Sequence, residues 1–218
     1  VLAGLWGNAH FARPHLSESV TLACGMHDEA WRMLDQTPTL DPDMGWPCSF
    51  ITMPIHRLLP AYLDGADRVA RLDPYAGLLV TMHYQGFFNH RFGLMPTALD
   101  RTIDASQRSL IDRFIADCTG LRARCRSLAP MSGYLHEAAR NLEHSYLLLQ
   151  IVDSISVLLC VDPNRTWPVG LMRATPMSES ASITMRRLEG NRVQVAPYPF
   201  SNDQIQITFP SRRIPNRQ

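Results

Sequence analysis

The chain has 218 residues, 45% of them hydrophobic, which is enough for one globular domain with a buried core. Its 21 basic and 20 acidic residues give a formal net charge of +1, so there is no electrostatic reason to expect nucleic acid or an anionic membrane as a partner. Every basic residue is an arginine. Lysine is therefore excluded as a Schiff-base former or a P-loop contact, and an anionic substrate must be held by arginine, metal or backbone.

The cysteine pattern and the N-terminal sequence indicate the compartment. Five cysteines are scattered along the chain without a CxxC pair, which is typical of reduced thiols in a cytoplasm. No apolar run approaches the roughly 20 residues that span a bilayer, and the N-terminus lacks the layout of a signal peptide. We therefore expect a cytoplasmic protein that acts on a small molecule and has no nucleic-acid or membrane partner.

The first half of the chain alternates between predicted helices and loops. Residues 1–6 have the character of a helix end, so we expect further residues upstream of Val1. Ser17 is the predicted N-cap of a helix over residues 18–35, in which apolar side chains recur at steps of three and four. A stretch rich in Pro, Asp, Gly and Thr over residues 37–54 reads as a loop, and the next helix is predicted over residues 55–72.

Three further helices are predicted before the chain changes character. The segment 75–90 is apolar on most sides, so we expect a central helix there. Residues 97–126 form a long amphipathic pattern, and residues 130–160 form another whose second half is strongly apolar.

A small sheet is predicted after Asp162-Pro163. Polar and apolar residues alternate over 182–187, 193–195 and 204–209, with a hairpin turn at Gly190-Asn191. We expect a mainly α protein with a helical bundle over residues 1–162 and a small antiparallel sheet over 163–218 packed on it. This sheet either covers the bundle or mediates a homodimer.

Asp153 is the most conspicuous polar residue, because it lies in the apolar run from Leu147 to Leu159. A buried carboxylate without a partner costs several kcal/mol. Its partner is expected to be a metal ion, an arginine, or a polar stripe that includes Tyr146 and Gln150.

Other potential ligands lie on separate predicted helices. His27-Asp28 falls in the middle of the first amphipathic helix, His56 lies near the start of the next, and His83 lies on the central one. Each histidine taken alone is typical of a core or surface residue. Together with Asp153, the four helices can gather imidazole and carboxylate ligands around one bundle core, and iron, manganese and zinc all accept such mixed sets.

The order of these residues resembles the HD-domain superfamily of metal-dependent helical proteins. The resemblance implies that His27 and Asp28 are the HD pair, with Asp28 a bridging carboxylate, and that Asp153 is the final ligand on the late helix. His56 and His83 resemble the two histidines of its binuclear branch, which implies one or two divalent ions. Near His83, the segment 89–91 (Asn-His-Arg) is interpreted as either a polar rim of the site or an exposed helix end.

The chain is also similar, over nearly its whole length, to a family of uncharacterised bacterial proteins. The stretches that carry this similarity include residues 27–31, residues 72–79 and residues 196–200. The similarity implies no reaction.

Two departures from the HD pattern affect the interpretation. The first histidine of the superfamily has no clear counterpart; we expect it before Val1, with His10 and His15 as alternatives. Many hydrolase and oxygenase members carry a lysine shortly after the HD pair, where this chain has Trp31.

Three functions are compatible with these residues. The first is a metal-dependent hydrolase acting on a small phosphate-containing substrate, with Asp28 and Glu29 as catalytic residues and Glu29 as the proton acceptor. The second is a di-iron oxygenase, which the spacing of His56 and His83 favours. The third is a degenerate HD fold without catalysis, suggested by the missing first histidine.

Overall fold

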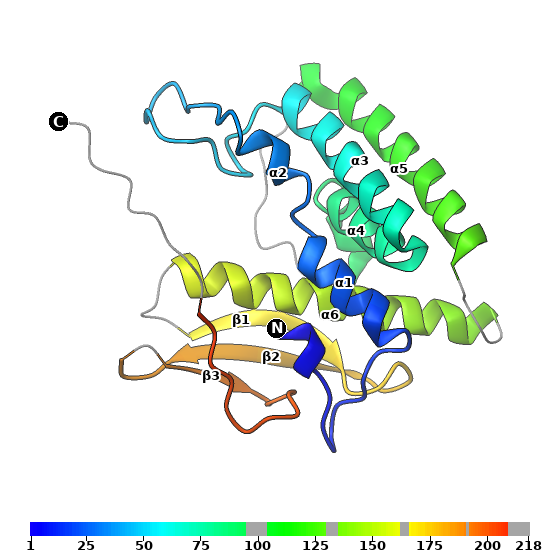
Figure 1. Cartoon of the computed structure of the whole chain (residues 1–218), viewed down its shortest axis with the longest axis vertical. Helices are drawn as coiled ribbons and strands as arrows, with labels where there is room; N and C mark the ends of the chain where they lie inside the picture. Colours follow the sequence, from blue (N-terminus) through cyan, green and yellow to red (C-terminus); the bar gives the residue numbers. More distant parts are fainter. Residues whose placement is uncertain (95–103, 130–134, 162–165, 191, 209–218) are drawn as a thin grey trace.

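The computed structural model describes residues 1–94, 104–129, 135–161, 166–190 and 192–208. The protein is mainly helical with a small three-stranded antiparallel sheet, as predicted (Figure 1). The helices are α1 (Ser17–Met26), α2 (Trp31–Leu34), α3 (Ile55–Leu72), α4 (Pro74–Gly86), α5 (Arg108–Leu128) and α6 (Leu135–Val161). Short 3-10 turns occur at η1 (Ala3–Leu5), η2 (His90–Gly93) and η3 (Ala105–Gln107). The strands are β1 (Thr166–Arg173), β2 (Ser180–Arg187) and β3 (Val193–Ala196).

Helix α6 crosses the middle of the molecule and separates two layers. It contacts α1 and α4 on one side and β1 on the other (Figure 1). In the layer formed by the remaining helices, α4 packs against α3, α5 and α1. Every residue of α4 from Tyr75 to Gly86 is buried, which confirms the predicted central helix and follows from apolar side chains on all of its faces.

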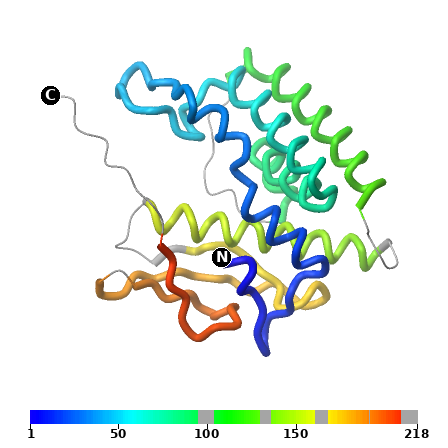
Figure 2. The backbone as a smooth tube through the Cα atoms, in the orientation of Figure 1, coloured from blue at the N-terminus to red at the C-terminus, as the bar shows by residue number. Residues whose placement is uncertain are grey.

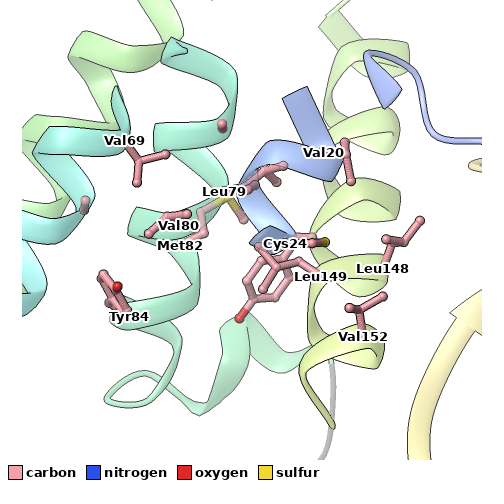
Figure 3. Packing of buried hydrophobic residues seen from close by; sticks show 14 of the residues in the cluster. Val20, Cys24, Val69, Leu79, Val80, Met82, Tyr84, Leu148, Leu149 and Val152 are labelled. Carbon is pink, nitrogen blue, oxygen red and sulfur yellow. The ribbon is translucent and has the colours of Figure 1, made fainter. Parts of the chain in front are cut away.

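The core is built by side chains from four helices that meet around α4. Figure 3 shows Val20 and Cys24 of α1 beside residues of α4 and α6. This packing requires small residues where the helices come closest. A side-chain carbon at Gly77 of α4 would overlap the backbone of Ala70 in α3, so α3 and α4 can touch at this depth only if residue 77 is glycine.

The N-terminal segment lies with the sheet layer, although it was predicted to belong to the helical bundle. The Gly7 amide donates to the Pro199 carbonyl (2.9 Å), and the Ala12 amide donates to the Ala174 carbonyl (2.7 Å) (Figure 2). Trp6 is 1% exposed and packs edge-on against Phe200, at 5.7 Å between ring centroids. The two ends of the described chain therefore close against each other beside the sheet.

Several predicted elements have different bounds in the structure. The helix predicted over 18–35 is interrupted after Met26, and the predicted helix end over 1–6 is a single 3-10 turn. The helix predicted over 75–90 ends at Gly86. The chain then leads into η2, where four successive residues, His90 to Gly93, have positive φ. Parts of the helices predicted over 97–126 and 130–160 lie outside the described residues.

The strand predictions were partly wrong. Residues 204–208 form no strand in the structure, because their alternation finds no neighbouring strand to pair with. Strand β1 was not predicted, because it contains Pro168 and Gly170, which weaken a strand pattern. The structure accommodates both at a register shift on an edge strand, where a missing amide hydrogen bond costs least.

Although the sequence has no uninterrupted apolar run of about 20 residues, one described helix is a candidate membrane span by length and composition alone. In the described part of the chain, residues 136–160 of α6 are long and apolar enough to do so. Most of the apolar window in this helix is buried inside the protein, at 61%, so the packing of α6 between the two layers accounts for its apolarity.

Gly77→Ala tests the close approach of α3 and α4. Because the added carbon overlaps backbone, we expect the free energy of unfolding to fall by about 2–3 kcal/mol in urea denaturation. Gly120 is the matched control, since a side-chain carbon there meets nothing within 4 Å. Gly120→Ala should raise the free energy of unfolding by about 0.5–1 kcal/mol. Equal effects of the two substitutions would contradict the described helix contact.

Candidate metal centre

The interruption between α1 and α2 places the His27-Asp28 pair. Residues 27–30 form a turn in which the Glu29 amide donates to the Met26 carbonyl (3.0 Å). The His27 ring folds back on the end of α1, where Nδ1 lies 2.8 Å from the Cys24 carbonyl oxygen. A carbonyl can only accept, so Nδ1 carries a proton and donates it. The last carbonyls of a helix lack helical partners, and this bond satisfies one of them while fixing the imidazole.

Two carboxylates face the other nitrogen of His27. Its Nε2 lies 3.3 Å from Oδ2 of Asp28 and 3.3 Å from Oδ1 of Asp153. The side chains of His27 and Asp153 are 13% and 17% exposed, whereas that of Asp28 is 67% exposed. The site is therefore closed on the α6 side by Asp153 and open to solvent beside Asp28.

The charges of this group are strongly coupled. Burial alone would lower the pKa of His27, but hydrogen bonds to Asp153 and Asp28 raise it to about 11. Burial alone would raise the pKa of Asp153, but the hydrogen bond from His27 holds it below its usual range. In the protein without a metal ion, His27 is thus an imidazolium between two carboxylates.

His83 lies beside His27 as a neutral imidazole. It is 2% exposed, and its ring centroid is 5.4 Å from that of His27. Burial lowers its pKa to about 4. The Gln150 side-chain amide nitrogen lies 3.0 Å from Nδ1 of His83, and an amide nitrogen can only donate, so Nδ1 accepts and the proton of His83 is on Nε2.

The structure thus brings together four of the five predicted ligands, His27, Asp28, His83 and Asp153. The fifth, His56, is exposed in the first turn of α3, and no hydrogen bond, ion pair or ring contact joins it to the other four. It follows Ile55, which is on the buried face of α3, and adjacent residues of a helix point about 100° apart. His56 therefore faces solvent.

Glu29, the predicted proton acceptor, is paired with an arginine. Its Oε1 accepts from Nε of Arg68 at 3.1 Å, and its backbone carbonyl accepts from the same guanidinium at 3.1 Å. The arginine holds both the carboxylate and the turn, so in this structure Glu29 stabilises the turn after the HD pair.

The donor set can be compared with the needs of a metal ion by spacing, type and charge. In the segments that the structure describes, no three or more His, Cys, Asp and Glu side chains are gathered closely enough to hold an ion as they stand. The two 3.3 Å separations nevertheless compare with the roughly 3 Å between neighbouring ligands of an ion with bonds of about 2.1 Å. One neutral imidazole and two carboxylates carry two negative charges, which a divalent cation balances, and the exposed Asp28 carboxylate is free to turn.

Arg91 also lies near this group of side chains. From the sequence, residues 89–91 are either a polar rim of the site or an exposed helix end. Arg91 belongs to η2, and its guanidinium lies 4.5 Å above the Phe87 ring. Its charge contributes to lowering the pKa of both His83 and Asp153, so it lies close to the centre. Of the two interpretations of residues 89–91, the polar rim fits Arg91, whereas His90 is exposed.

The comparisons with known proteins give one match. The profile of a family described as "protein of unknown function (DUF3891)" matches residues 1–216. No curated protein and no solved structure matches the chain at a significant level. The similarity to an uncharacterised family over nearly the whole chain is thereby confirmed, and the family description gives no reaction, metal or superfamily.

The coupled charges predict a pH dependence of stability for the metal-free protein. The raised pKa of His27 means that its contribution is complete below its ordinary value of 6.5 and is lost as the pH rises toward about 11. The lowered pKa of Asp153 means that its contribution is present above the ordinary value of 3.8 and is lost as the pH falls below it.

Asp153→Asn should therefore destabilise the metal-free protein most between about pH 4 and 6.5, by about 3 kcal/mol. The difference from wild type should shrink between about pH 7 and 10. Urea denaturation of both proteins across this range measures it. A difference that stays constant with pH would show that His27 and Asp153 are not paired as described.

Proposed function

Because the chain belongs to the DUF3891 family, whose description names no activity, we propose from its side chains that it is a metal-dependent hydrolase of the HD type. Its substrate in this proposal is a small phosphate-containing molecule. The observation that carries the proposal is the position of His27 Nε2, at 3.3 Å from a carboxylate oxygen of both Asp28 and Asp153. These three residues correspond to the HD pair and the late aspartate of the superfamily.

The residues would hold a single divalent ion, such as iron, manganese or zinc. His27 supplies Nε2, because its Nδ1 is engaged by the Cys24 carbonyl, an arrangement typical of metal-bound histidine. Asp28 and Asp153 supply carboxylate oxygens. When bound, such an ion lowers the pKa of a water molecule and neutralises charge on phosphoryl oxygens.

The remaining catalytic roles are assigned to side chains around the proposed ion. Asp28 has the exposed carboxylate of the group, so it lies where a substrate and water can reach, and we assign it the acceptance of a proton. We do not assign this role to Glu29, whose carboxylate is held by Arg68. Neutral His83, with a proton on Nε2, adds a hydrogen-bond donor at the inner wall without adding charge.

The position of His56 favours hydrolysis over the di-iron oxygenase. A second ion in the superfamily requires both middle histidines, and only His83 lies beside the centre. The missing first histidine, which suggested a non-catalytic fold, leaves one ligand position to water in this proposal. We also propose a cytoplasmic location, which the free state of all five cysteines supports. The small-molecule substrate is a proposal that rests on the side chains of the site.

Metal content and phosphatase activity test this proposal together. Wild-type protein purified without chelators should contain about one ion per chain and should hydrolyse p-nitrophenyl phosphate. Asp153→Ala should lose the ion, and kcat/KM should fall by at least about 100-fold, because a ligand is removed. Asp64→Ala, at an exposed position of α3, is the matched control and should keep both.

His56→Ala separates one ion from two. Because His56 is exposed and away from the centre, this variant should keep the full metal content and activity. A halved metal content in His56→Ala would indicate a binuclear centre and would favour the di-iron oxygenase over the hydrolase. Full metal content in Asp153→Ala, or a wild-type protein with no bound ion, would contradict the proposal.

A further inference from the structure

A second group of polar side chains beside the centre contains buried atoms that have no hydrogen-bond partner within the described part of the chain. Four buried atoms are affected: Oδ1 of Asn89, Nη1 of Arg91, Nε of Arg122 and the hydroxyl of Tyr146. Tyr146 is completely buried. Leaving such atoms unpaired costs far more than a typical hydrogen bond contributes, so their common location needs an explanation.

These side chains lie at the C-terminal end of α4. A side-chain carbon at Gly86 would overlap the Tyr146 hydroxyl and would lie 3.4 Å from Cδ of Arg91, so both residues border this glycine. The Phe92 ring links them to Arg122. It lies 5.6 Å from the Tyr146 ring, and the Arg122 guanidinium lies 4.8 Å above it. The group thus joins η2, α5 and α6 around one point.

No described carboxylate forms an ion pair with this group, although the charge of Arg91 acts on Asp153 at longer range. Among the described residues, the ion pairs involve neither Arg91 nor Arg122, and the one side-chain hydrogen bond of Arg122 goes to the neutral Gln85 (2.8 Å). Burial lowers the pKa of Arg122, which is the sign of a partly desolvated cation. The guanidiniums of Arg91 and Arg122 and the buried hydroxyl of Tyr146 are donors of the kind that an oxyanion requires.

The two guanidiniums are also fixed in place. Arg91 stacks on Phe87 at 4.5 Å, and Arg122 stacks on Phe92. Arg91 and Phe92 have φ of 51° and 57°, so the backbone of η2 adopts a left-handed conformation that non-glycine residues rarely take. The fold therefore holds a strained segment in the position that presents Arg91 to Tyr146.

The group is connected to the metal centre along α6. Tyr146, Gln150 and Asp153 follow one another at steps of four and three residues, which places them on one face of the helix. The rise between Tyr146 and Asp153 is about 10 Å.

We propose that Arg91, Arg122 and Tyr146 form an anion-recognition subsite that binds a second phosphate or carboxylate group of the substrate. The assignment of that anion to the substrate rests on the proposed hydrolase function; the binding of an oxyanion by these residues does not. The chain contains no lysine, so arginine is the only permanently charged side chain available for this task.

Inorganic phosphate is the probe, and metal-free protein prepared with a chelator is the sample, so that phosphate cannot be held by an ion. Isothermal titration should show binding to wild type. Arg91→Gln and Arg122→Gln should each weaken it by at least about tenfold, because one charge-assisted contact is lost. Arg113→Gln removes the same charge from an exposed position of α5 and should leave binding unchanged.

If an arginine variant does not fold, Tyr146→Phe provides the test. This variant should fold, because it removes only the hydroxyl. It should weaken phosphate binding about three- to tenfold. Unchanged phosphate binding in Tyr146→Phe and in both folded arginine variants, or no phosphate binding by wild type, would overturn the subsite and leave internal water as the partner of these donors.

The outcomes separate the two proposals. If the wild-type protein binds phosphate through Arg91 and Arg122 but purifies without a metal ion, the hydrolase function fails and the subsite stands. If the wild-type protein contains a metal ion and hydrolyses p-nitrophenyl phosphate, but Tyr146→Phe and both folded arginine variants bind phosphate in the metal-free state as wild type does, the subsite fails alone. With both correct, Arg91→Gln should raise KM more than it lowers kcat for a substrate with two phosphate groups.

Discussion

The largely buried carboxylate of Asp153, whose side chain is 17% exposed, is the constraint on which the arrangement of the helices depends. It lies on a helix whose neighbouring side chains, such as Leu149 and Val152, form the core (Figure 3). A carboxylate at such a position must face a cation, and among the described residues the one within hydrogen-bond distance is the His27 imidazolium. The contact joins the end of α1 to α6. The same interaction therefore places the His27-Asp28 pair and holds the two helices together.

In the proposed metal centre, the geometry around His27 would let a metal ion take the place of the proton on Nε2. Its Nδ1 is committed to the Cys24 carbonyl, so only Nε2 faces the two carboxylates. A proton on Nε2 neutralises part of their charge, and a divalent ion would neutralise all of it. The neighbouring His83 is kept neutral by burial, which avoids a second positive charge at the same place.

Much of this site could be predicted from the sequence because its residues break local patterns. Asp153 is an ionisable residue within an apolar helix, and His83 is a polar residue on the helix predicted to be central. Both expectations of burial follow from hydrophobic periodicity alone. The apolar positions of α3 also give its bounds, and they could have shown that His56, one residue after Ile55, faces away from the core.

Other features depend on contacts that no local pattern records. The helix predicted over 18–35 ends at Met26, where the His27 side chain bonds to a backbone carbonyl, and an amphipathic pattern continues through this interruption. Strand β1 is stabilised by β2 and α6 despite Pro168 and Gly170. Arg122 had no distinguishing signal, because an arginine on an amphipathic helix is ordinarily solvated.

Anomalous diffraction from crystals of the protein loaded with Mn²⁺ shows whether the group around His27 binds a metal ion. We expect one anomalous peak within coordination distance of Nε2 of His27 and of carboxylate oxygens of Asp28 and Asp153, with Nδ1 of His27 still bonded to the Cys24 carbonyl. Crystals in which His27 remains between the two carboxylates while no peak appears there, or in which manganese binds elsewhere, would show that the group is an internal ion pair and would contradict the account.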